Sequence, residues 1–106
     1  MSKTSTNPER SLSGVQKRHL RGLAHSLKPV IHIGKQGLTE SLCHQVGQLL
    51  FQHELIKVKV LDACPLDRKT CAQSLAEQTQ ADVVQMIGKL LVLYRPHPEE
   101  PIIQLP

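Results

Sequence analysis

Aromatic residues are nearly absent from this sequence, whose 106 residues include one Phe, one Tyr and no Trp. RNA-recognition motifs and single-strand-binding barrels stack nucleotide bases on exposed aromatic side chains. A chain with two aromatic residues cannot build such a stacking platform. If it binds a nucleic acid, we expect the contacts to go mainly to the phosphate backbone.

Cysteine and long apolar runs are also scarce. The three cysteines, Cys43, Cys64 and Cys71, form no C-x-x-C pair, so the sequence predicts neither a disulfide framework nor a metal site, and we expect reduced, buried thiols. No apolar run approaches the roughly 18–20 residues of a membrane span, and residues 1–10 lack the apolar core of a signal peptide. We therefore expect a soluble, cytoplasmic protein with no membrane partner.

The sequence lacks the common motifs of nucleotide chemistry. Neither G-x-x-x-x-G-K-[ST] nor G-x-G-x-x-G occurs, which argues against an ATPase or a dehydrogenase. Cys43 and His44 are adjacent, but neighbours on a helix point about 100° apart and do not pair as nucleophile and base. We expect no enzymatic activity, no cofactor and no small-molecule substrate.

Positive charge is concentrated in the first third of the chain. Residues 1–37 contain seven Lys and Arg against one Glu, a net charge of +6, whereas residues 38–106 contain six Lys and Arg against eight acidic residues, a net charge of −2. Most Lys and Arg residues are simply solvated. A charge polarised in this way nevertheless favours a polyanionic partner.

An amphipathic helix is predicted after residues 1–10, a polar arm that we expect to be disordered. Ser13 is a suitable N-cap, and the helix should end before Pro29. Apolar residues gather on one side of it at 3.6 residues per turn, namely Leu12, Val15, Leu20, Leu23 and Leu27. The opposite side is basic and carries Lys17, Arg18, Arg21, His25 and Lys28.

A short strand, Val30–Ile33, leads into the loop Gly34-Lys35-Gln36-Gly37 and then into a second helix that Thr39 can cap. Two glycines permit positive φ and leave bare backbone that a phosphate can approach, and the helix N-terminus adds N–H donors. Lys35 would add a charge and Gln36 a neutral donor. A G-x-x-G sequence is also typical of a plain tight turn, but the basic helix one short strand away favours phosphate binding.

The remaining chain predicts one further strand, a third helix and a two-stranded hairpin. An alternating strand turns Lys57 and Lys59 to one face, Asp67 can cap a third helix, and Gly88-Lys89 suits a type II′ turn between the last two strands. The order α-β-α-β-α-β-β predicts an α/β fold with a mixed four-stranded sheet packed by three helices.

Several separated motifs together resemble one known family. They are Lys17 to His25, Leu27 to Val30, Gly34 to Glu40, His53 to Lys59, Ile87 to Lys89 and Leu93 to Pro96. In this order they are similar to the bacterial YhbY proteins, stand-alone members of the CRM (chloroplast RNA splicing and ribosome maturation) domain family. The resemblance implies a fold similar to the C-terminal domain of translation initiation factor three, RNA binding through the G-x-x-G loop, and association with precursors of the large ribosomal subunit. The stretch Thr79-Gln80-Ala81-Asp82 departs from the family pattern, because we would expect a glycine there to end the third helix.

We therefore expect a monomer with one CRM RNA-binding domain at residues 11–96 and a Pro-rich irregular tail at residues 97–106. The expected function is binding to the phosphate backbone of structured ribosomal RNA during assembly of the large subunit. The expected contact residues are Gly34, Lys35, Gln36, Gly37, Lys17, Arg18, Arg21, His25 and Lys28, with Lys57 and Lys59 as further candidates. An adaptor that binds an acidic protein through the basic helix is the alternative.

Overall fold

The computed structural model describes residues 12–106, so the arm expected at residues 1–10 lies outside the described residues. Its helices are α1 (Gly14–Ala24), α2 (Glu40–His53) and α3 (Arg68–Thr79). Its strands are β1 (Pro29–Ile33), β2 (Leu55–Val60), β3 (Asp82–Ile87) and β4 (Leu90–Tyr94). The predicted order α-β-α-β-α-β-β is confirmed.

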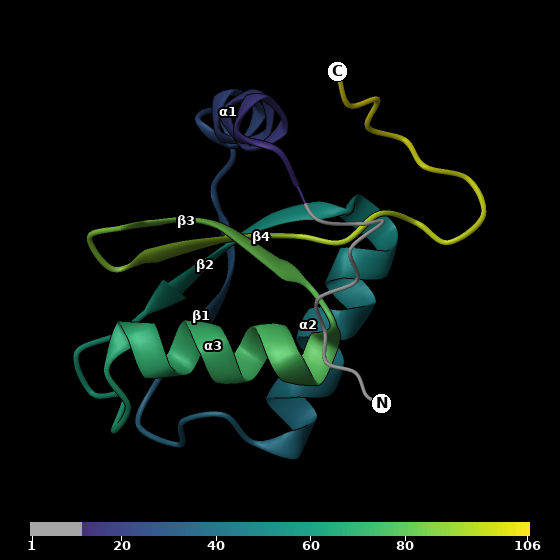
Figure 1. The fold of residues 1–106 in the computed structure, drawn as a ribbon. Helices are drawn as coiled ribbons and strands as arrows, with labels where there is room; N and C mark the ends of the chain where they lie inside the picture. The colour runs from purple at the N-terminus through teal and green to yellow at the C-terminus, as the bar shows by residue number, and fades with distance from the viewer. Residues whose placement is uncertain (1–11) are drawn as a thin grey trace.

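The four strands form one mixed sheet in the order β1-β2-β4-β3. β1 pairs parallel with β2, whereas β4 pairs antiparallel with both β2 and β3. Ile87 lies opposite Leu90, and Gly88 has a φ of 56°, so β3 and β4 are joined by the predicted two-residue turn. Figure 1 shows α1 over one face of the sheet and α2 and α3 over the other.

Side-chain alternation along the strands divides the interior into two clusters, one on each face of the sheet. The larger cluster lies against α2 and α3 and includes Ile33, Leu50, Ile56, Val58, Leu75 and Leu91. The smaller cluster lies against α1 and contains Leu20, Ala24, Leu55, Val84, Val92 and Tyr94. The helix that carries Lys17, Arg18 and Arg21 is therefore held by the smaller of the two clusters.

Each helix begins directly after the residue that the sequence predicts as its N-cap. The Ser13 hydroxyl accepts a hydrogen bond from the Gln16 N–H at 3.1 Å, and the Gln16 side chain accepts one from the Ser13 N–H at 3.0 Å. Thr39 caps α2 and Asp67 caps α3 in the same way. Among residues 12–106, no helix combines the length and apolar character needed to cross a bilayer.

The end of α1 differs from the prediction. α1 ends at Ala24, so Lys28 lies beyond the helix and does not belong to its basic face. The chain needs residues 25–28 to descend from α1 to the edge of the sheet, where Pro29 begins β1. The predicted apolar face is also wrong in part, because Leu20 and Ala24 alone are buried within α1, while Val15 and Leu23 are 57% and 42% exposed.

The tail after β4 contains no helix or strand, yet it is fixed to the domain. The Glu54 carboxylate is fully buried and accepts hydrogen bonds from the backbone N–H groups of His97, Ile102 and Ile103 at 2.6, 2.9 and 2.7 Å. Farther along, the Gln16 side chain donates to the Pro106 carbonyl at 3.2 Å. The tail therefore links the start of β2 to α1.

Candidate nucleic-acid interface

The loop Gly34–Gly37, named the GKQG turn below, is a tight turn closed by a hydrogen bond from the Gly37 N–H to the Gly34 carbonyl at 3.0 Å. Lys35 and Gln36 are exposed at its tip. Gly37 is buried and has a φ of +70°, and a Cβ built on it would lie 3.4 Å from Pro65 Cγ. Gly34 has no positive φ, so only the second glycine needs its conformational freedom.

The start of α2 behind the turn is less favourable to an anion than its dipole alone suggests. The Thr39 hydroxyl already accepts the Leu42 N–H at 3.0 Å, and Glu40 places a carboxylate in the first helical turn. That negative charge opposes the attraction of the helix N-terminus for a phosphate. Lys35 is therefore the main source of attraction at this turn.

Two other segments gather beside the GKQG turn at the same end of the sheet. Leu61 of the β2–α3 loop donates its N–H to the Ile33 carbonyl at 2.9 Å, and Val60 donates to the Lys89 carbonyl at 2.8 Å. The Arg68 guanidinium donates to the Gly88 carbonyl. The fold thus adds two exposed cations, Arg68 and Lys89, to this end of the sheet.

Sequence reasoning did not find Arg68 and Lys89. They lie more than 30 residues beyond the turn and in no motif that carries charge, and only the sheet topology brings them near it. Lys89 pairs with Asp62 at 2.7 Å, and this partner lowers the pKa of the Asp62 carboxyl. Both groups are exposed, so the pair is weak and Lys89 can exchange its partner.

The basic face of α1 opens onto the sheet. Arg18, Arg21 and His25 follow one another at three- and four-residue intervals and point to one side of the helix. They line a groove, named the α1–sheet groove below, whose other wall is the part of the sheet next to α1. That wall consists of Lys57, Gln85, Ile87, Leu90 and Val92.

The α1–sheet groove thus brings four predicted contact residues together, namely Arg18, Arg21, His25 and Lys57. No Asp or Glu lines it. Lys59 is the next residue along β2 on the face of Lys57, about 6–7 Å farther on, and His32 of β1 pairs with it in the sheet register. Lys17 is exposed on α1 but does not line the groove.

No residue of the GKQG turn lines the α1–sheet groove. α1 leads into the first residue of β1 and the turn follows the last, so the two segments lie at opposite ends of that strand. Figure 1 shows α1 on the far side of the sheet from the loop that enters α2. Lys57 and Lys59 lie on β2 between these two ends. They are therefore stronger candidates for contact residues than the sequence alone made them.

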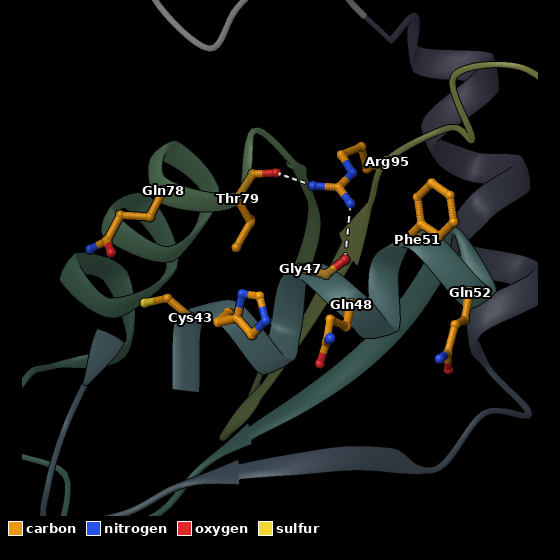
Figure 2. Close-up of a pocket in the computed structure, with 9 residues that line it drawn as sticks. Cys43, Gly47, Gln48, Phe51, Gln52, Gln78, Thr79 and Arg95 are labelled. Atoms are coloured by element: carbon orange, nitrogen blue, oxygen red, sulfur yellow. Dashed lines mark hydrogen bonds between the residues drawn. The ribbon is translucent and has the colours of Figure 1, made fainter. Parts of the chain in front are cut away.

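A separate cleft lies between α2 and α3 (Figure 2). The guanidinium of Arg95 crosses it and donates to the carbonyls of Thr79 and Gly47 at 2.7 and 2.9 Å, so this cation holds the two helices together. Phe51 packs against His97, with ring centroids 4.5 Å apart. No Asp or Glu lines this cleft, and the described part of the chain holds no group of three His, Cys, Asp or Glu residues that could bind a metal.

The cysteines do not form a reactive site. Cys43 and Cys71 are buried, and burial raises the pKa of both thiols, that of Cys71 to about 12. A thiol that stays protonated is a poor nucleophile. His44, next to Cys43, is exposed and points away from the core. Cys64 is half-buried in the β2–α3 loop beside Pro65.

Comparison with known proteins assigns the chain to a family. The model of the CRS1/YhbY (CRM) domain matches residues 12–95, which is most of the chain. The chain belongs to the CRM family. The resemblance stated from the sequence motifs is therefore confirmed, and this CRM domain contains both the GKQG turn and the α1–sheet groove.

The chain is similar to several named proteins and to solved structures. An "RNA-binding protein" of Haemophilus influenzae is 47% identical over 91% of this chain and 96% of its own length. The "Probable RNA-binding protein YqeI" of Bacillus subtilis is 40% identical over 90% of this chain and 99% of its own. The solution structure of a Staphylococcus aureus protein has a TM-score of 0.76 and 44% identity, covering 91% of this chain and all of its own.

Proposed function

We propose that this CRM protein is a non-enzymatic, cytoplasmic RNA-binding factor that contacts the phosphate backbone of structured ribosomal RNA during assembly of the large subunit. The observation that carries the proposal is the α1–sheet groove, where Arg18, Arg21, His25 and Lys57 converge and no carboxylate lines the surface. The names of the relatives in Haemophilus and Bacillus support RNA as the ligand.

Backbone contact is the mode of binding that the side chains of this protein favour. Tyr94 is 2% exposed, and Phe51 lies on α2, across the sheet from the α1–sheet groove. Neither ring can stack a base that lies in the groove. Arg and Lys neutralise phosphates without reading the sequence, so binding is governed by the shape of the RNA and weakens steeply with salt.

The proposed surface has a centre and two extensions. The centre is the α1–sheet groove, and Lys59 continues it along β2 towards the end of the sheet where the GKQG turn presents Lys35. Lys17 extends it on the outer side of α1. Gln36 would donate to phosphate beside Lys35, while Gly34 and Gly37 shape the turn. Lys28, beyond the end of α1, lies at the margin of the proposed surface.

Charge removal tests the centre of this surface. We expect Arg18→Gln combined with Arg21→Gln to lower affinity for a ribosomal RNA fragment about tenfold or more, because charge-assisted hydrogen bonds to phosphate are lost. The plot of log affinity against log salt concentration should become shallower by about 0.7–0.9 for each lost phosphate contact. Fluorescence anisotropy across a salt series measures both quantities.

The matched control is Lys69→Gln, which removes an exposed cation from α3, on the opposite face of the sheet from α1. It should leave the affinity and the salt slope nearly unchanged. Lys35→Ala, measured alone, reports on the GKQG turn. Parent-like affinity in the α1 double variant would exclude the groove. If Lys35→Ala weakened binding in that case, the contact would lie at the turn instead.

Association with the large subunit needs a separate experiment. Sedimentation of cell extracts, followed by cross-linking and sequencing of the attached RNA, should place the chain on large-subunit precursors. Attachment to messenger or transfer RNA instead would keep the RNA-binding proposal and overturn its ribosomal part.

A further inference from the structure

A second groove, separate in character from the first, lies where the C-terminal end of α1 meets β1 and the tail. Its walls carry three apolar side chains that the core does not bury, Leu23, Leu27 and Val30, which are 42%, 37% and 46% exposed. Leu55 and Ile103 also line it. We name it the Leu27 groove; its volume is about 540 Å³.

These leucines are exposed for a reason that the fold makes clear. Leu20 and Ala24 attach α1 to the sheet, and the helix ends at Ala24, so Leu23 and Leu27 turn away from that contact. Single exposed apolar residues are ordinary, but contiguous ones that line a groove are characteristic of interaction sites. β1, which supplies Val30, is also an edge strand of the sheet.

The rim of the Leu27 groove is positively charged. Lys28, His53 and Lys57 line it, and no Asp or Glu does. An occupant must therefore present apolar side chains to the floor and negative charge to the rim. Complementary charge of this kind selects between partners that an apolar surface alone would not distinguish.

Three other occupants fit this chemistry poorly. RNA would meet an apolar floor that offers no hydrogen-bond donor to a phosphate. A second copy docked about a two-fold axis would bring the same basic rim, with Lys28 and Lys57, from each copy to one interface. Residues 1–11 of this chain contain one apolar residue, Met1, and more basic than acidic residues.

We propose that the Leu27 groove binds an acidic amphipathic segment of another protein. Apolar side chains of that segment lie between Leu23, Leu27 and Val30, and its carboxylates face Lys28 and Lys57. Segments of this type commonly bind as a helix whose apolar residues, three and four positions apart, enter a groove. This inference does not rest on the proposed RNA function, because the two grooves share Lys57 alone among their lining residues.

Site-specific photo-cross-linking in cells of the native host tests the proposal. A benzoyl-phenylalanine placed at Leu27 should give a ribonuclease-resistant adduct with a protein, and mass spectrometry should locate the attachment within a segment that combines acidic and apolar residues. The matched control has the same probe at Val15, which is 57% exposed on α1 but does not line the groove, and should not give this adduct.

A peptide of the attached segment, titrated onto the full-length ¹⁵N-labelled chain, then measures the contact. We expect Leu27→Ser to weaken the peptide about tenfold and Val15→Ser to leave it unchanged, with RNA affinity the same in both. The proposal is overturned by attachment to RNA, by attachment to a second copy of this chain, by a segment without acidic residues, or by the absence of any adduct specific to Leu27.

Discussion

Glu54 combines two unusual properties in one residue. Its φ is 66°, which is rare outside glycine, and its side chain is completely buried. The unusual backbone turns the chain from α2 directly into β2, and the three N–H groups that the carboxylate accepts from the tail offset the cost of burying its charge.

We expect Glu54→Gln to destabilise the domain by about 2–4 kcal/mol, because the amide NH₂ would face a backbone N–H and at least one donor of the tail would lose its acceptor. Urea unfolding measures the loss, and amide exchange at Ile102 and Ile103 should rise. Glu77→Gln, an exposed carboxylate on α3, is the control and should change neither quantity. Unchanged exchange in the tail would contradict this role of Glu54.

The position of Glu54 could not be predicted from the sequence. A glutamate between a helix and an apolar strand is normally solvated, and the groups that it binds lie 43 to 49 residues away. The exposure of Lys35 and Gln36 could be predicted, because a G-x-x-G turn exposes its two central residues whatever the rest of the fold does.

Among the elements, α2 contains an unexplained weakness at Gly47. A glycine inside a helix costs about 1 kcal/mol relative to alanine. No heavy atom would lie within 4 Å of a Cβ built there, so close packing does not require this glycine. Its carbonyl accepts a hydrogen bond from the Arg95 guanidinium.

We therefore expect Gly47→Ala to raise the free energy of unfolding by about 0.5–1 kcal/mol, measured by urea unfolding. Gly37→Ala provides the contrast and should lower stability, since its φ of +70° is a backbone conformation that a residue with a Cβ rarely adopts. A destabilised Gly47→Ala variant would mean that the new methyl group disturbs the bond to Arg95.

The elements themselves were predictable where short-range chemistry decides them. Ser13, Thr39 and Asp67 cap helices because their side chains reach an N–H three residues on. The end of α1 at Ala24 could not be predicted, because the helical periodicity of the apolar residues continues to Leu27. The helix ends earlier because residues 25–28 must reach the edge of the sheet, where β1 begins. The end of α3 needs no glycine, because Gln80 itself adopts the left-handed conformation with a φ of 58°.

Across the whole molecule, the two faces of the sheet are unequally packed. The cluster under α2 and α3 contains most of the fully buried large side chains, whereas α1 is held by a few residues and by the tail. Regions with less buried apolar area open more readily than the rest of a domain. α1 and the tail should therefore form the least stable unit.

Native-state hydrogen exchange tests this order. We expect amides in the middle of α1 to exchange through an opening smaller than global unfolding, with protection clearly below that of α2 and of β4. RNA bound in the α1–sheet groove should raise the protection of α1 selectively. If α1 and α2 exchanged with the same free energy and the same denaturant dependence, the two faces would unfold as one unit.

The candidate site was predictable as a set of residues but not as a shape. Charge counting and helical spacing identify Arg18, Arg21 and His25 from the sequence alone. The wall that completes the groove depends on how far α1 covers the sheet, which long-range packing decides. The same packing separates the GKQG turn from α1, although only residues 25–33 divide them in the sequence.

The three thiols differ in how accessible they are to chemical reagents. Alkylating dyes react with accessible thiolates. Cys43 and Cys71 are buried and therefore protected from such dyes, so Cys64 is the natural position for a label. The ring of its neighbour Pro65 lies next to Gly37. A fluorophore on Cys64 would consequently lie beside the GKQG turn and report the binding of a ligand there. No substitution in the chain is needed to attach it.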